Sequence, residues 1–81
     1  MEKSVVMSLA GHDKGQIYVA VGEKDEKLLL CDGKCKTLEN PKPKNKKHLK
    51  EIAKVNLSAY NPLYDAHIRS VLKSVKKDNC L

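Results

Sequence analysis

The fold is decided by the stretch Val5-Val6-Met7-Ser8-Leu9-Ala10-Gly11-His12-Asp13-Lys14-Gly15-Gln16-Ile17-Tyr18-Val19-Ala20-Val21. Two apolar runs flank a polar connection, and both are rich in β-branched residues, which suit strands better than helices. In the second run, alternation places Ile17, Val19 and Val21 on one face of the sheet. Tyr18 and Ala20 lie on the other face. The stretch therefore predicts two strands, over residues 4–9 and 16–23, joined by a short loop.

The loop between these strands has a glycine on each side of His12-Asp13-Lys14. Gly11 and Gly15 can adopt a positive φ without a Cβ penalty and allow another backbone to approach closely. The loop also offers several backbone N–H groups beside the Lys14 cation. It is therefore either an anion-binding loop or simply the corner of a hairpin.

A second turn signal, Asp32-Gly33, follows the short apolar run 28–31. A two-residue Asp-Gly loop between apolar runs is a strong hairpin signal, so we expect strands over residues 28–31 and 34–38. The charged residues 24–27 form the turn before them. Four strands are thus expected in the first half of the chain.

The chain has three cysteines, Cys31, Cys35 and Cys80. In the expected hairpin Leu30 pairs with Cys35 and Cys31 with Lys34, so Cys31 and Cys35 face opposite sides of the sheet and cannot form a disulfide with each other. Their spacing also lacks the paired CxxC clusters of a zinc site. We interpret them as buried or incidental thiols in a reducing cytosol.

Residues 40–47 read Asn-Pro-Lys-Pro-Lys-Asn-Lys-Lys. Pro41 and Pro43 lack N–H donors and disfavour a helix in the residues before them. The segment therefore predicts an extended, exposed loop. Its basic side chains are those of Lys42, Lys44, Lys46 and Lys47.

A C-terminal helix is expected over about residues 62–77. It can begin at Asn61-Pro62, a good N-cap followed by proline at the first helical position, or later at Asp65, which suits the N-terminal dipole. One apolar stripe recurs at helical spacing and should pack on the sheet. Its residues are Ile68, Val71, Leu72 and Val75.

The net charge of +6 is concentrated in the middle of the chain. Residues 1–31 carry four lysines against five acidic residues, and residues 32–54 carry eight lysines against three. Residues 55–81 carry four basic residues against two acidic ones. A localised basic segment is typical of a polyanion-binding surface, although a solvated lysine surface is the plainer alternative.

The order of residues resembles a known motif. A strand, Gly11, a charged segment ending in Lys14-Gly15 and an alternating strand together look like the KOW motif of ribosomal proteins and transcription elongation factors. The downstream series Asp32-Gly33-Lys34, Leu38-Glu39-Asn40-Pro41-Lys42 and Lys47-His48-Leu49 resembles the small KOW-domain RNA-binding proteins of bacteria. These are relatives of the archaeal and eukaryotic large-subunit ribosomal proteins. The resemblance covers roughly residues 4–52.

The resemblance implies a mainly β fold: one domain over residues 1–81, with a small SH3-like β-barrel of about five strands at about 3–53. The C-terminal helix, at about 62–77, would pack against it. A fifth strand is implied at residues 48–52, where the spacing of Leu49 and Ile52 alone fits a helical turn equally well. One departure is Cys35, since these proteins often carry an arginine after the Asp-Gly-Lys series.

The residues expected to bind RNA come from the resemblance together with the basic segment. Lysines neutralise phosphates and release counterions, which gives affinity without reading sequence. Lys34 and Lys36 would share a face of the expected fourth strand. The full expected set is Gly11, His12, Lys14, Gly15, Lys34, Lys36, Lys42, Lys44, Lys46, Lys47 and His48.

The aromatic content bears on the kind of RNA. The chain has no Phe or Trp, and its three tyrosines are Tyr18, Tyr60 and Tyr64. Splayed single-stranded bases are normally stacked on aromatic platforms, so we expect backbone and shape contacts with folded, double-helical RNA. Tyr18 is the one candidate for stacking, and a hydrogen-bonded barrel tyrosine is the alternative.

We expect a noncatalytic RNA-binding protein, associated with the ribosome and contacting large-subunit ribosomal RNA, with ribosomal proteins as further possible partners. The sequence holds no catalytic motif and no His/Cys cluster with metal spacing, so neither cofactor nor metal is expected. It shows no signal peptide and no apolar run near the ~20 residues of a membrane span, which favours the cytoplasm. The alternative is an SH3-like protein-interaction module in a transcription or translation complex.

Overall fold

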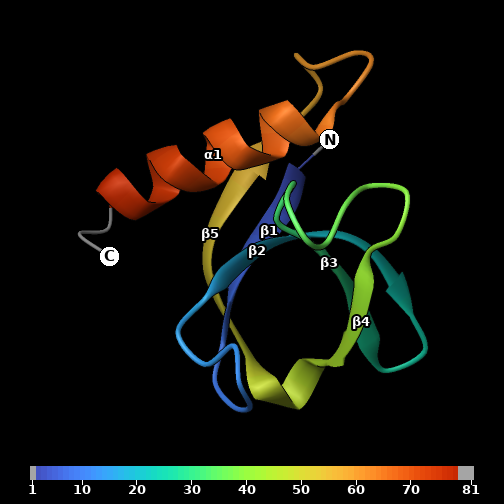
Figure 1. The fold of residues 1–81 in the computed structure, drawn as a ribbon, viewed down its shortest axis with the longest axis vertical. Helices are drawn as coiled ribbons and strands as arrows, with labels where there is room; N and C mark the ends of the chain where they lie inside the picture. The colour runs from blue at the N-terminus through green and yellow to red at the C-terminus, as the bar shows by residue number, and fades with distance from the viewer. Residues whose placement is uncertain (1, 79–81) are drawn as a thin grey trace.

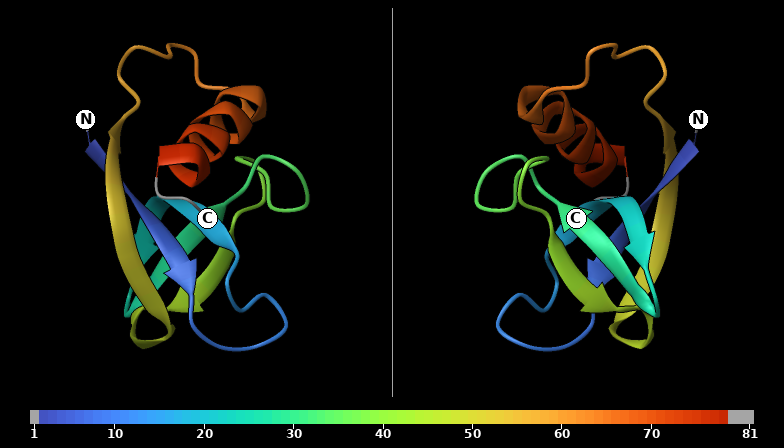
Figure 2. Two further views of the ribbon diagram at one scale, coloured as in Figure 1. Left: turned by 90° about the vertical axis from the view of Figure 1, so that its left-hand side faces the viewer. Right: turned by 90° about the vertical axis from the view of Figure 1, so that its right-hand side faces the viewer.

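A computed structural model describes residues 2–78, in which five strands form one antiparallel sheet of order β4-β3-β2-β1-β5. The sheet curls into a small barrel, and the helix α1 lies across one end of it (Figures 1 and 2). The predicted fold class, mainly β with about five strands and a C-terminal helix, is confirmed. The elements are β1 (Glu2–Ser8), β2 (Ile17–Lys24), β3 (Lys27–Cys31), β4 (Lys42–Asn45), η1 (Lys46–His48, a 3-10 turn), β5 (Leu49–Asn56) and α1 (Asp65–Asp78).

Both faces of β2 are buried, which is why its sequence is apolar at successive positions. Ile17 and Val19 pack in one cluster with Val5 and with three residues of the apolar stripe of α1. Tyr18 and Ala20 pack in a second cluster on the other face of the sheet. The stripe of α1 therefore faces the sheet, as predicted, through its buried members Ile68, Leu72 and Val75.

The fourth strand is not where the Asp-Gly turn signal placed it. Leu30 pairs with Lys42 of β4 rather than with Cys35, and residues 33–36 form bends. The Asp32 carboxylate accepts hydrogen bonds from the backbone N–H groups of Lys34 (2.9 Å) and Lys36 (3.0 Å). A local side chain thus satisfies donors that a strand ladder would otherwise use, so the predicted hairpin at 34–38 is wrong.

The basic segment 40–47 is an ordered part of the fold rather than an exposed loop. Residues 42–45 form β4, and Lys46 and Lys47 begin η1. Pro43 is tolerated because β4 is an edge strand that pairs with β3 alone. The fifth strand implied at residues 48–52 is present from Leu49 onward as β5, whereas His48 ends the turn η1. The helical-turn alternative is therefore wrong for Leu49 and Ile52.

The helix begins at Asp65, the later of the two expected starts. Asn61 and Pro62 precede it in an irregular connection. The His67 Nδ1 atom accepts a hydrogen bond from the backbone N–H of Tyr64 at 3.0 Å, which satisfies one donor at the start of the helix. The Asp65 carboxylate instead accepts the backbone N–H of Leu38 at 2.8 Å and thereby ties the 32–38 segment to α1.

Candidate nucleic-acid interface

The loop between β1 and β2 is organised around the carboxylate of Asp13. This group accepts hydrogen bonds from Ser8 Oγ (2.8 Å), Tyr18 Oη (3.0 Å) and Lys44 Nζ (2.8 Å). The hydrogen bond with Lys44 holds the pKa of the Asp13 carboxyl well below its usual range. Asp13 therefore fastens the loop to β1, β2 and β4 together. We call Ser8, Asp13, Tyr18 and Lys44 the Asp13 network.

The backbone of this loop is largely occupied by its own hydrogen bonds. The N–H of Lys14 donates to Gly11 O (3.3 Å), that of Gly15 to Ser8 O (2.9 Å) and that of Gln16 to Asp13 O (2.9 Å). Three of the donors that suggested an anion-binding loop are therefore already bonded to carbonyl groups of the loop and of Ser8. Gly11 and Gly15 have φ values of 86° and 89°, so both glycines serve the shape of the turn.

Tyr18 is the hydrogen-bonded barrel tyrosine of the alternative interpretation. Only 2% of the residue is exposed, so its ring offers no face on which a base could stack. Burial and the hydrogen bond to Asp13 raise the pKa of its hydroxyl above the ordinary value. The Lys36 Nζ atom lies 5.1 Å from the ring centroid, a cation–π contact. Tyr18 therefore serves the structure of the barrel and is wrong as a stacking platform.

Two of the expected RNA-binding lysines are engaged in ion pairs. Lys44 is held by Asp13 and by the carbonyl of Ala10 (3.0 Å), with only 14% of its side chain exposed. Lys46 pairs with Glu23, and both of these side chains are about half exposed. Lys44 therefore has a structural role, whereas Lys46 keeps access to solvent.

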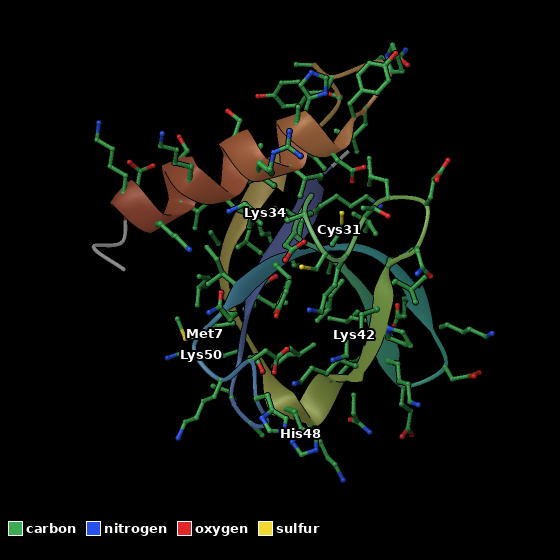
Figure 3. All side chains as sticks on the ribbon, viewed as in Figure 1. Met7, Cys31, Lys34, Lys42, His48 and Lys50 are labelled. Carbon is green, nitrogen blue, oxygen red and sulfur yellow. The ribbon has the colours of Figure 1, made fainter. Side chains whose placement is uncertain are left out.

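Lys47, His48 and Lys14 lie at the end of the barrel away from α1. All three side chains are exposed, and the backbone N–H of Leu9 donates to His48 O at 2.8 Å, which places the β1–β2 loop beside η1. In Figure 3 His48 is labelled at this end, while Lys34 is labelled close to α1. The expected residues therefore form more than one group on the surface.

The largest group of expected residues surrounds an open hollow of about 510 Å³, which we call the barrel hollow. It brings together side chains from the β1–β2 loop, the 32–36 bends and β4. Lys42, labelled in Figure 3, and Lys36 are the lysines there that lie outside the Asp13 network. The expected residues that line the barrel hollow are Gly11, His12, Lys36, Lys42 and Lys44.

A second hollow, of about 360 Å³, lies between α1 and residues 32–34, and we call it the helix groove. Gln16 and Asp32 line both hollows, so the two adjoin. Of its four basic side chains only Lys34 was expected. The others lie on one face of α1 at i, i+4 and i+7, and this helical spacing was the signal available in the sequence. They are Arg69, Lys73 and Lys76.

The two cysteines in the described part of the chain are both free thiols. Cys31 is buried in β3, and burial raises its pKa to about 11. Cys35 is exposed and lines the barrel hollow. The third cysteine, Cys80, lies outside the described residues.

Two features are absent from residues 2–78. None of the described residues belongs to a helix that is long and apolar enough to cross a membrane. The same part of the chain contains no group of three or more His, Cys, Asp or Glu side chains placed to hold a metal ion.

Comparison with protein-family models and with curated proteins finds no match for this chain. The fold and the two hollows therefore define the molecule by themselves: a small β-barrel with a C-terminal helix and a concave basic surface where the two meet.

Proposed function

We propose that this protein is a noncatalytic RNA-binding protein that contacts backbone phosphates, with large-subunit ribosomal RNA as its target. The observation that carries the proposal is the junction of the two hollows. Their linings together present seven lysine and arginine side chains against two aspartates, Asp13 and Asp32. Asp13 is neutralised by Lys44, so the surface has a marked excess of positive charge. Such a surface attracts a polyanion.

The aromatic residues favour phosphate contacts over base stacking. Tyr18 is buried, and Tyr60 is stacked on His67 with the ring centroids 4.5 Å apart. Tyr64 is 61% exposed but lines neither hollow. Recognition of splayed bases uses exposed aromatic platforms, and double-helical RNA is contacted mainly through its backbone and shape. The proposed target is therefore double-helical RNA, and the ribosomal assignment rests on the resemblance to KOW-domain proteins.

The exposed apolar surface gives less support to a protein-interaction module. Among the described residues, the large hydrophobic side chains that are exposed are Leu9 and Tyr64. They belong to the β1–β2 loop and to the connection before α1, at opposite ends of the barrel. Scattered exposed hydrophobic residues are normal, and protein-binding surfaces usually present a contiguous patch.

The first experiment is a salt titration of binding to purified large-subunit RNA, with cosedimentation of the protein and ribosomal subunits. Each phosphate contact should contribute about 0.7 to 0.9 to the slope of log affinity against log salt. The test variant is Lys36→Gln/Lys42→Gln, and the matched control is Lys24→Gln/Lys27→Gln at the β2–β3 turn. Lys44 and Lys46 are left unchanged because their ion pairs would confuse stability with binding.

The proposal predicts steep salt dependence for the wild type, a shallower slope for the Lys36/Lys42 variant and a wild-type slope for the control. Equal slopes for both variants would mean that only net charge matters. Binding that does not change with salt would overturn the proposal and favour a protein-interaction module, since an apolar interface releases no counterions.

A further inference from the structure

We propose that the helix groove is itself a phosphate-binding site, built from Lys34, Arg69, Lys73 and Lys76, which grips the backbone of the RNA that the barrel hollow contacts. The inference rests on the proposed function and adds three residues, Arg69, Lys73 and Lys76, that belong neither to the KOW-like series nor to the basic residues 32–54. The target chemistry is the phosphodiester backbone of double-helical RNA.

The groove is held in shape by the docking of the 32–38 segment on α1. Arg69 Nη1 donates to Gly33 O at 2.6 Å, and the Asp65 carboxylate accepts the backbone N–H of Leu38 at 2.8 Å. Gly33 has a φ of 78°, and a Cβ atom there would stand 2.4 Å from the carbonyl oxygen of Asp65. The segment approaches the helix this closely because residue 33 has no side chain. The backbone at Lys34 is therefore held beside α1 before any ligand binds.

Three of the four cations of the groove are free of the contacts that hold the groove together. Lys34, Lys73 and Lys76 are exposed, and within residues 2–78 none of the three forms an ion pair. The carboxylate that lines the groove, Asp32, already accepts two backbone N–H groups. Among the described residues, the groove thus has four cations against one carboxylate that is not paired with any of them, whereas the barrel hollow has one lysine paired with Asp13.

The arrangement of the cations fits a chain of phosphates better than a single anion. Arg69, Lys73 and Lys76 follow one another along one face of α1, over about 10 Å of helix axis at 1.5 Å per residue. The buried side chains of Leu72 and Ile17 form the floor between α1 and β2. A row of separated charges along an open groove can neutralise successive phosphates of one strand.

The inference is tested with a double-helical RNA of about 16 base pairs, the length that a double-stranded-RNA-binding domain spans. Lys73→Gln/Lys76→Gln should weaken binding roughly tenfold near 100 mM salt and flatten the slope by about 1.5, the loss expected for two phosphate contacts. Lys73→Arg/Lys76→Arg should retain the wild-type affinity and the wild-type salt slope, because both positive charges remain. Lys24→Gln/Lys27→Gln loses the same charge at the distant β2–β3 turn and should leave the slope unchanged.

The possible results separate this inference from the proposed function. One result is that Lys73→Gln/Lys76→Gln keeps the wild-type affinity and salt slope while Lys36→Gln/Lys42→Gln loses affinity. This result would overturn the proposal that the helix groove binds phosphate, and it would leave the proposed RNA binding intact. Equal losses for the groove variant and the β2–β3 control would also overturn it, because a nonspecific charge effect would be enough. Absence of salt-dependent RNA binding by the wild type would overturn both proposals together.

Discussion

The Asp13 network and the helix groove use lysine in opposite ways. In the network, the Lys44 side chain is 14% exposed, pairs with Asp13 and donates a hydrogen bond to the carbonyl of Ala10. These contacts hold the β1–β2 loop to β4. In the groove, Lys73 and Lys76 are exposed and make no ion pair within the described residues. The difference shows that a lysine-rich run does not by itself mark a binding surface. A lysine is available to a ligand only where the fold has not already paired its ammonium group with a carboxylate.

The largest effect on stability is expected from breaking the Asp13 network. Lys44→Met should lower the free energy of unfolding by about 2–3 kcal/mol, because the Asp13 carboxylate would remain partly buried with one partner fewer. Urea denaturation of both proteins at pH 7 measures the difference.

The control for this prediction is the exposed ion pair of Lys46 with Glu23. Lys46→Met should change the free energy of unfolding by about 0.5 kcal/mol or less, since exposed pairs contribute little. If Lys44→Met and Lys46→Met lowered the free energy of unfolding by similar amounts, burial would not distinguish the contributions of the two lysines. The proposed difference between the Asp13 network and an exposed ion pair would then be wrong.

A second prediction concerns the docking that builds the helix groove. Gly33→Ala should lower the free energy of unfolding by about 2 kcal/mol, because the new Cβ meets the backbone of Asp65 and the residue has a left-handed φ. The same variant should weaken RNA binding, since Lys34 would no longer be fixed beside α1. Thermal denaturation and the salt titration measure the two effects.

Gly15→Ala is the matched control for Gly33→Ala. Gly15 has a φ of 89°, but a Cβ atom there would have no neighbour within 4 Å. Gly15→Ala should therefore lower the free energy of unfolding by about 1 kcal/mol, the penalty for placing a Cβ atom on a left-handed backbone. If Gly15→Ala were as costly as Gly33→Ala, the close packing of the 32–38 segment on α1 would be unnecessary for stability.

The smallest effect is expected from a change of pH, which should leave the contribution of Asp13 to stability unchanged near neutrality and reduce it in acid, where the carboxylate becomes protonated. Lys44 holds the pKa of the folded carboxyl below its ordinary value, so the unfolded chain takes up this proton first, near pH 4. Stability from this group is complete above pH 4 and is lost as the pH falls further. Urea denaturation between about pH 6 and 2.5 should show a steeper loss for the wild type than for Asp13→Asn.

The helix-groove variant provides the comparison for the acid experiment. Lys73→Gln/Lys76→Gln should keep the wild-type slope of stability against pH, because neither lysine contacts the Asp13 network. Parallel curves for the wild type and Asp13→Asn would show that the network does not contribute to stability through this carboxylate.

Prediction from the sequence succeeded where the signal was local. Alternation in residues 16–23 identified β2, and the stripe of Ile68, Leu72 and Val75 identified the face of α1 that packs on the sheet. It failed at residues 34–38, because the Asp32 side chain bonded the backbone and removed the need for a hairpin partner. The second partner of β3, besides β2, is β4, and Pro41 and Pro43, before and within this strand, had argued for a loop.

The sequence likewise indicated only some of the residues that line the candidate site. The basic residues 32–54 include Lys36 and Lys42, which line the barrel hollow, but the prediction gave equal weight to Lys44, which is paired with Asp13. The cations of α1 were visible as basic residues around an amphipathic helix. Their face could be assigned to a groove only once the 32–38 segment was seen to lie against it.

The sequence by itself determined the mainly β class, the C-terminal helix and the excess of positive charge, because periodicity and composition act over neighbouring residues. The tertiary structure alone decided which cations remain available. Asp13 and Lys44 are 31 residues apart, and Gly33 and Arg69 are 36 apart. Charge neutralisation and groove shape depend on distances between groups that the chain brings together only by folding.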